Sequence, residues 1–136
     1  MDEYGYFDHD ADIGIVGRGA TLERAFESAA AAMFAIMAEE LPGALDNEIA
    51  FRFEEEDTEF ALVRWLNGLL ARAQSRSLVL GRFELRREGT VWHAKAWGVP
   101  WNRDILRGVE VKGATLTMLR VEEREGLWEA RCIVDV

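Results

Sequence analysis

The sequence has few of the residues that would suggest an extracellular, membrane-bound or multi-domain protein. It contains one cysteine, Cys132, which cannot form an internal disulfide, and only two prolines, which leave little material for a linker. No apolar run approaches the roughly 18 residues that a membrane span needs, and the chain starts with acidic residues where a signal peptide is basic. The sequence therefore predicts a cytoplasmic protein with a single domain over residues 1–136.

Basic residues are also scarce. There are 16 lysines and arginines against 25 aspartates and glutamates, which gives a net charge of −9. Proteins that bind nucleic acid directly usually have the opposite balance, because their affinity comes largely from neutralising phosphates. We therefore expect any role with RNA to be indirect, through a partner that holds the RNA. Only Lys95 and Lys112 are lysines, so arginine carries most of the positive charge.

Two segments have the periodicity of amphipathic helices. Apolar residues recur at helical spacing over 22–37 and over 58–73. The expected N-cap is Thr21 for the first helix and Asp57 or Thr58 for the second. Both apolar stripes favour core packing over cofactor binding. The acidic residues 54–57 precede the second helix, where negative charge suits the helix dipole, and this favours a solvated helix start over a metal site.

The remaining apolar residues mostly alternate with polar ones, which is typical of strands. The expected strands lie at residues 4–8, 12–16, 49–53, 83–85, 90–97 and 127–134, with two more within 109–121. Strands, a helix, a strand and a helix are thus followed by a run of strands. This order predicts an α+β fold, a largely antiparallel sheet with two amphipathic helices packed on one face.

The densest polar cluster lies near the N-terminus, where Asp8, His9, Asp10 and Asp12 fall within five positions. Three like charges so close repel one another, so solvent, an arginine or a cation must offset them. Hard cations such as calcium prefer several oxygen ligands, but the glycine and glutamate of an EF-hand loop are absent here. The spacing favours a solvated turn and leaves a metal site open.

Two further candidates lie in the second half of the chain. Residues 132–136 are too apolar for a loose tail, so we expect an inner strand that holds Asp135 at its rim. Lys112 falls in a predicted strand whose alternation places Glu110, Lys112 and Ala114 on one face. A solvent-facing lysine is the simpler interpretation. The preference for arginine elsewhere suggests that a lysine is wanted here for its point charge or adjustable pKa.

Other chemistries have little support in the sequence. There is no Walker loop, and residues 14–19 lack the Gly-x-Gly spacing of a dinucleotide site. One cysteine and two distant histidines, His9 and His93, do not predict zinc, and no serine lies in a nucleophile elbow. We therefore do not expect a freestanding enzyme. A metal-dependent hydrolase of phosphate esters is the minor alternative.

Five segments, in order and with fitting spacing, resemble the archease family over nearly the whole chain. They are His9-Asp10-Ala11-Asp12-Ile13-Gly14, Thr21-Leu22-Glu23-Arg24-Ala25-Phe26-Glu27-Ser28-Ala29-Ala30, Trp65-Leu66-Asn67-Gly68-Leu69-Leu70, Glu110-Val111-Lys112 and Asp135-Val136. Two departures stand out. Asp10 replaces the family threonine and adds a carboxylate, and residues 113–117 lack the Tyr-His pair that follows the lysine in many members.

The resemblance implies a protein cofactor rather than an enzyme. Archeases promote guanylylation and multiple turnover of RtcB-type tRNA-splicing RNA ligases, which use GTP and divalent metal. The resemblance implies that Asp12, Asp135 and Val136 bind a divalent cation. Calcium is the expected ion, and magnesium and manganese are the alternatives. Lys112, with His9 and Asp10 of the first motif, belongs to the surface that activates the ligase. The alternative implied role is a chaperone-like binder of a tRNA-modifying methyltransferase.

Overall fold

The computed structural model of this chain describes residues 2–9, 11–41 and 44–136. Within these residues, two helices and eight strands follow one another. The helices are α1 (Leu22–Met37) and α2 (Thr58–Ser75), and the strands are β1 (Glu3–His9), β2 (Asp12–Gly19), β3 (Asn47–Glu54), β4 (Leu78–Glu88), β5 (Val91–Pro100), β6 (Gly113–Ala114), β7 (Arg120–Arg124) and β8 (Leu127–Asp135).

Side-chain caps define where both helices begin. The Thr21 hydroxyl accepts a hydrogen bond from the backbone N–H of Arg24 at 3.1 Å. The Asp57 carboxylate accepts from Glu59 N at 2.8 Å and from Phe60 N at 3.0 Å. Each cap satisfies backbone donors that have no partner within the helix. The two predicted helices and the Thr21 cap are confirmed, and Asp57 is the cap of α2 where the sequence left Asp57 and Thr58 as alternatives. Helix α2 extends to Ser75.

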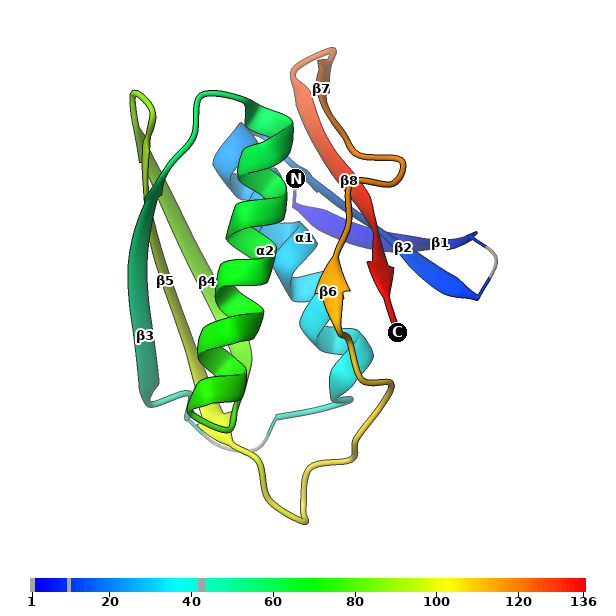
Figure 1. Ribbon diagram of the computed structural model, residues 1–136, viewed down its shortest axis with the longest axis vertical. Coiled ribbons are helices and arrows are strands. Elements are labelled where there is room, and N and C mark those ends of the chain that lie inside the picture. Colours follow the sequence, from blue (N-terminus) through cyan, green and yellow to red (C-terminus); the bar gives the residue numbers. More distant parts are fainter. Residues whose placement is uncertain (1, 10, 42–43) are drawn as a thin grey trace.

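The strands pair antiparallel throughout, but in two sheets rather than one. The larger sheet has the order β1-β2-β8-β6, with β7 also paired to β8, and the smaller has the order β3-β5-β4. Both helices lie between the two sheets (Figure 1). The predicted α+β class is confirmed, whereas the expectation of one sheet is wrong. The reason is that β8 returns to pair with β2, while β3 pairs with the β4–β5 hairpin.

Aromatic residues join the helices to the smaller sheet in the core. Trp65 of α2 is fully buried, and its indole N–H donates to the carbonyl of Phe26 in α1 at 2.8 Å. The Phe26 ring stacks on Trp92 of β5, with ring centroids 5.5 Å apart. The predicted apolar stripes thus face the core, as expected from their periodicity.

Close packing joins α1 to the larger sheet. A Cβ atom at Gly17 of β2 would lie 2.3 Å from both the carbonyl oxygen of Ala25 and the backbone nitrogen of Ala29. Only glycine allows the strand to approach the helix backbone so closely. This contact places β2 in a defined position over α1.

Stacking on aromatic rings gives several arginines a role that lysine would fill less well. The planar guanidinium group packs flat on a ring, which an ammonium group cannot do. The guanidinium carbons lie 4.0–4.6 Å from the ring centroids in the pairs Arg72–Phe51, Arg82–Trp97, Arg87–Trp92 and Arg107–Trp101.

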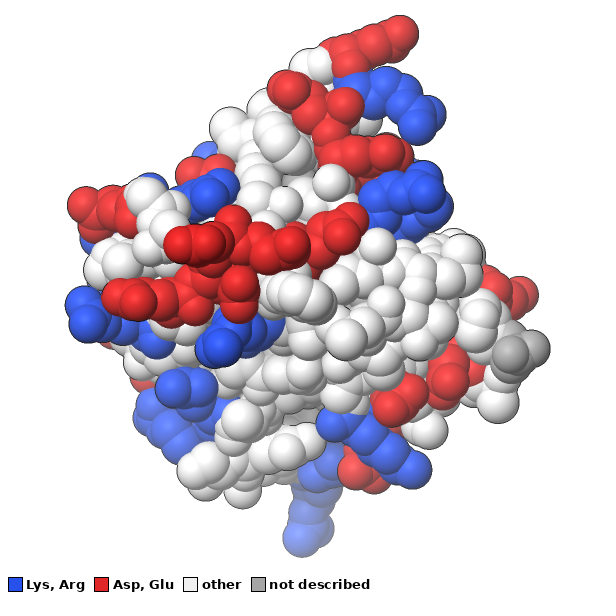
Figure 2. All heavy atoms as spheres, turned by 45° about the horizontal axis from the view of Figure 1, so that its top comes forward, with Lys and Arg blue, Asp and Glu red and all other residues white. Residues whose placement is uncertain are grey.

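On the face drawn in Figure 2, basic and acidic side chains lie among one another. None of the described helices has the length and apolar character to cross a membrane.

Candidate metal and partner-binding site

One end of the larger sheet aligns residues from four strands in a row. His9 of β1 lies opposite Asp12 of β2, and Asp135 of β8 lies opposite Gly113 of β6. Between these pairs, Ile13 lies opposite Val134. One register step further along the same two strands, Asp12 and Asp135 therefore occupy facing positions. The register thus brings together two predicted metal ligands that are far apart in sequence.

Hydrogen bonds hold the members of this row near Lys112. The backbone N–H of Val136 donates to Asp12 Oδ1 at 3.4 Å. The backbone N–H of Lys112 donates to the carbonyl oxygen of Asp135 at 2.8 Å. Figure 1 shows the end of β8 running beside β6. The structure therefore brings Asp12, Lys112, Asp135 and Val136 together.

The row lies on the face of the larger sheet that points away from the helices. Ile13 and Ile15 of β2, and Cys132 and Val134 of β8, pack in or against the core. Because side chains alternate along a strand, Asp12 and Asp135 point to the opposite face. We call this face the outer face of the larger sheet. Asp12 is half-buried, and Asp135 and Lys112 are exposed, so the site is accessible to a partner.

The glycine of the first motif has a packing role next to the row. A Cβ atom at Gly14 would lie 2.3 Å from atoms of the Phe7 ring. The ring of Phe7 therefore lies across the backbone of Gly14 on the adjacent strand. This packing joins β1 to β2 on the outer face of the larger sheet. His9, at the end of β1, is half-buried, and the predicted functional residue Asp10 lies outside the described residues.

Asn67 of α2 fixes the segment that carries Lys112, and sequence reasoning assigned it no role. Its side-chain amide donates to the carbonyl of Ala114 at 3.1 Å, and its Oδ1 accepts from Ala114 N at 2.8 Å. The amide thus pairs with β6 as a neighbouring strand would. The available signal was a polar amide beside the apolar stripe, in the Trp-Leu-Asn motif. Asn67 is a positioning residue for Lys112.

The predicted alternation around Lys112 is wrong in one respect. Lys112 is exposed but Ala114 is buried, so these two side chains do not share an environment. Only residues 113–114 form a strand, because the chain arrives there from an irregular segment in which Val111 is fully buried. Lys112 is therefore held at the start of β6 instead of in the middle of a long strand.

The donor atoms in this row are of one chemical type. The carboxylates of Asp12 and Asp135 and the oxygens of Val136 are hard ligands, which calcium, magnesium and manganese prefer. Two carboxylates at facing positions also repel each other, and a cation would offset that repulsion. Within the described ranges, no three His, Cys, Asp or Glu side chains group closely enough to hold a metal unaided.

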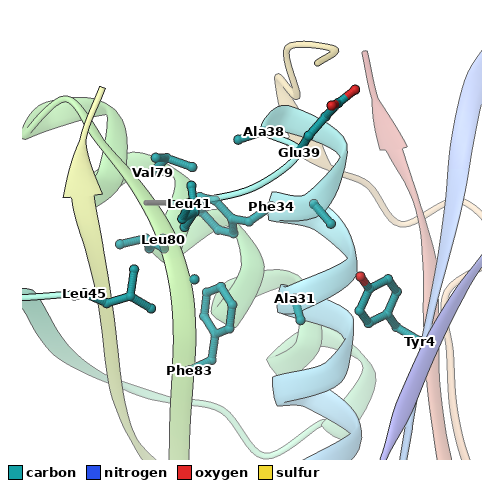
Figure 3. A pocket seen from close by; sticks show the side chains of 12 residues that line it. Tyr4, Ala31, Phe34, Ala38, Glu39, Leu41, Leu45, Val79, Leu80 and Phe83 are labelled. Carbon is teal, nitrogen blue, oxygen red and sulfur yellow. The ribbon is translucent and has the colours of Figure 1, made fainter. Parts of the chain in front are cut away.

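Other features of the molecule lie apart from this row. A cleft of about 410 Å³ runs between α1 and β4, and Phe34, Leu41 and Phe83 are among its lining residues (Figure 3). Among the described residues, none of those predicted to form the functional site lines this cleft. Burial raises the pKa of Cys132 to about 12, so this thiol is not an activated nucleophile. The candidate site is therefore an accessible sheet end rather than a pocket.

Comparison with known proteins identifies the family. A model of the archease protein family (MTH1598/TM1083) matches residues 4–136. The chain belongs to the archease family. Its relatives include the archeases of Sulfolobus acidocaldarius, 33% identical, and Pyrococcus furiosus, 32% identical, both over the full length of each protein. The archease of Methanosarcina mazei is 31% identical over 98% of this chain and 96% of that protein. The family predicted from the sequence motifs is confirmed.

Solved archease structures have the same fold. The solution structure of protein 1598 from Methanobacterium thermoautotrophicum is 29% identical and covers 98% of both chains, with a TM-score of 0.80. A crystal structure of an archease from Thermotoga maritima, described as a possible chaperone, has a TM-score of 0.67 at 22% identity. It covers 96% of this chain and 94% of its own.

Proposed function

We propose that this archease-family protein is a cofactor for an RtcB-type RNA ligase and promotes its guanylylation and multiple turnover. The observation that supports this role most is the gathering of Asp12, Lys112 and Asp135 at one accessible end of the larger sheet. These residues belong to three separate motifs of the family. RNA is held by the ligase, in keeping with the net charge of −9 of this chain.

In this proposal Asp12, Asp135 and Val136 hold a divalent cation. Calcium is the favoured ion, and magnesium and manganese are the alternatives. Their oxygens suit such an ion, and the facing carboxylates of Asp12 and Asp135 gain from it. The ligase supplies the ligands that these residues leave open. When bound, the cation neutralises negative charge that develops on phosphate oxygens.

Lys112 contributes a second positive charge beside the row. Its side chain is exposed, while its backbone is tied to Asp135 and the following β6 to Asn67. The fixed backbone keeps this point charge beside the row, where it stabilises phosphate oxygens that approach. His9 shares the row, and Asp10 follows it directly in the sequence, so we include both in the proposed ligase-activating surface.

The test is ligase guanylylation from GTP, with catalytic amounts of the ligase from the same organism. We expect the wild-type protein to stimulate the reaction, and Asp135→Asn and Lys112→Ala to lose that stimulation. Asp46→Asn and Lys95→Ala are the matched controls, because both residues are exposed and remote in sequence from the three motifs. A folded wild-type protein without any stimulation would lead us to abandon the proposal.

A chaperone-like role is the second candidate, with a tRNA-modifying methyltransferase as client. The observation in its favour is a set of exposed apolar side chains in residues 106–118, namely Leu106, Val109, Leu116 and Met118. Such a role predicts that suppression of methyltransferase aggregation survives in the double variant Asp12→Asn and Asp135→Asn. Loss of suppression in that variant would argue against an independent chaperone function.

A further inference from the structure

Arg131 of β8 has an unsatisfied polar atom on the outer face of the larger sheet. Its Nε is buried and finds no hydrogen-bond partner in the described part of the chain. Nor does its guanidinium group form an ion pair with any residue that the structure describes. A buried donor without an acceptor costs stability, so such an atom calls for an explanation.

A second arginine lies directly opposite. Arg120 of β7 pairs in register with Arg131, so two cations face each other across adjacent strands. Like charges in this arrangement destabilise a sheet. Arg120 approaches Glu122 only at 3.9 Å, and this contact is solvent-exposed. Glu122 and Glu129 face each other two residues away on the same strands, but both form ion pairs with other arginines. Among the described residues, Arg131 is therefore left without an acidic partner.

The arginine pair shares its face with the metal-binding row. Ala130 and Cys132 point into the core, so Arg131 points outward, as Asp135 does four residues later. At about 3.3 Å per residue, the two positions are roughly 13 Å apart along β8. Ile133 lies between them and exchanges backbone hydrogen bonds with Thr115 and Thr117.

Apolar side chains flank the pair. The segment bonded to Ile133 carries Leu116 and Met118, which are 60% and 47% exposed. Exposed apolar residues beside an arginine without an ion pair are typical of a protein–protein interface, in which arginine is enriched. An RNA surface would instead need an extended field of positive charge, which this acidic chain does not supply.

We propose that Arg131 and Arg120 bind a carboxylate side chain of the partner protein. The outer face from this arginine pair to the Asp12–Asp135 row is then the surface that docks on the ligase. The inference rests on the proposed cofactor function and adds a binding contact to it. A carboxylate fits because it accepts two parallel hydrogen bonds from the terminal nitrogens of a guanidinium group. Complex formation thus supplies the acidic partner that Arg131 lacks among the described residues.

The proposal makes stability and binding respond in opposite directions. Arg131→Met removes the unsatisfied atom and keeps an unbranched side chain, so we expect its melting temperature to equal or exceed that of the wild type. The same variant is expected to bind the RNA-free ligase at least 10-fold more weakly, since it loses a charge-assisted contact. A purely structural arginine would instead lower the melting temperature.

The experiment measures the dissociation constant for the immobilised, RNA-free ligase and the protein concentration that gives half-maximal guanylylation. We expect Arg131→Met and Arg120→Gln to raise both values and to leave maximal stimulation unchanged. Arg131→Lys, which keeps the charge but loses the fork, should fall between these variants and the wild type. Arg52→Gln is the control, because Arg52 is exposed on the smaller sheet.

Each other outcome overturns a defined part of the argument. If the wild type stimulates the ligase and Arg131→Met binds equally well, the arginine site is wrong and the cofactor function stands. If Arg131→Met binds the RNA-free ligase normally but the RNA-loaded ligase weakly, the ligand is a phosphate and the carboxylate assignment is wrong. A wild type that neither binds nor stimulates the ligase overturns both proposals.

Discussion

Asp12 Oδ1 accepts a hydrogen bond from the backbone N–H of Val136 at 3.4 Å, across 124 residues of sequence. The first motif of the chain is thereby tied to the last. One step beyond the Ile13–Val134 pair, the register of β2 and β8 places Asp135 opposite Asp12. The pairing of β2 with β8 is therefore the structural basis of the proposed metal site, and it leads to the first prediction.

Calcium should stabilise the wild-type protein and not the variants that lack its ligands. A ligand at 100 times its dissociation constant contributes about 2.7 kcal/mol to the unfolding free energy. We expect calcium to raise the melting temperature of the wild type and of Asp46→Asn, and to leave the double variant Asp12→Asn and Asp135→Asn unchanged. In EDTA, Asp135→Asn should melt no lower than wild type, because it relieves repulsion from Asp12. An equal calcium response in all four proteins would contradict the site.

Replacing Asn67 should loosen the segment that carries Lys112 without unfolding the protein. Asn67→Ala removes two hydrogen bonds to Ala114, whose backbone groups are left without these partners. We expect a loss of about 1–3 kcal/mol in urea unfolding, together with weaker stimulation of the ligase. Gln74→Ala, at an exposed position of the same helix, is the control. Full stimulation by Asn67→Ala would show that β6 needs no such support.

Two glycines of the first hairpin should respond differently to a methyl group. Gly17→Ala places a Cβ atom 2.3 Å from backbone atoms of α1, which cannot move aside cheaply. Overpacking of this kind typically costs about 1–3 kcal/mol, and we expect the upper end of this range where the backbone must shift. Gly5→Ala on the neighbouring strand meets nothing nearer than an Arg18 side-chain nitrogen at 3.9 Å. Thermal unfolding should therefore separate the two variants clearly, and equal melting temperatures would contradict the close packing of β2 on α1.

Glu27 should make stability fall as pH rises through the range just above the ordinary glutamate pKa of 4.5. Burial raises the pKa of Glu27, although the N–H of Leu85 and the charge of Arg24 partly oppose this. In that range the folded protein retains a proton that the unfolded chain releases, so the proton stabilises the folded state only at lower pH.

Urea unfolding of the wild type and Glu27→Gln across this pH range measures the effect. The Gln amide oxygen can still accept from Leu85 N, as Glu27 does at 2.9 Å. We expect the stability of the wild type relative to Glu27→Gln to decline with rising pH, and Glu40→Gln, an exposed control, to track the wild type. A difference that stays constant with pH would show that Glu27 does not titrate differently on folding.

Local sequence determined the helices, their caps and the family of this protein. The Thr21 and Asp57 caps act on residues two or three positions away, and the apolar stripe of α2 repeats every few residues. Such short-range chemistry can be recognised without knowing the rest of the chain. The order of five motifs likewise predicted the archease family, which the family match confirms.

Tertiary structure alone decided which distant residues meet. Alternating strands are compatible with many partners and registers, so the sequence did not predict the division into two sheets or the facing of Asp12 by Asp135. The amide of Asn67 and the unsatisfied Nε of Arg131 acquire their meaning only from β6 and β7 beside them. Pairing between residues far apart in the chain depends on the whole packed core, and no local pattern records it.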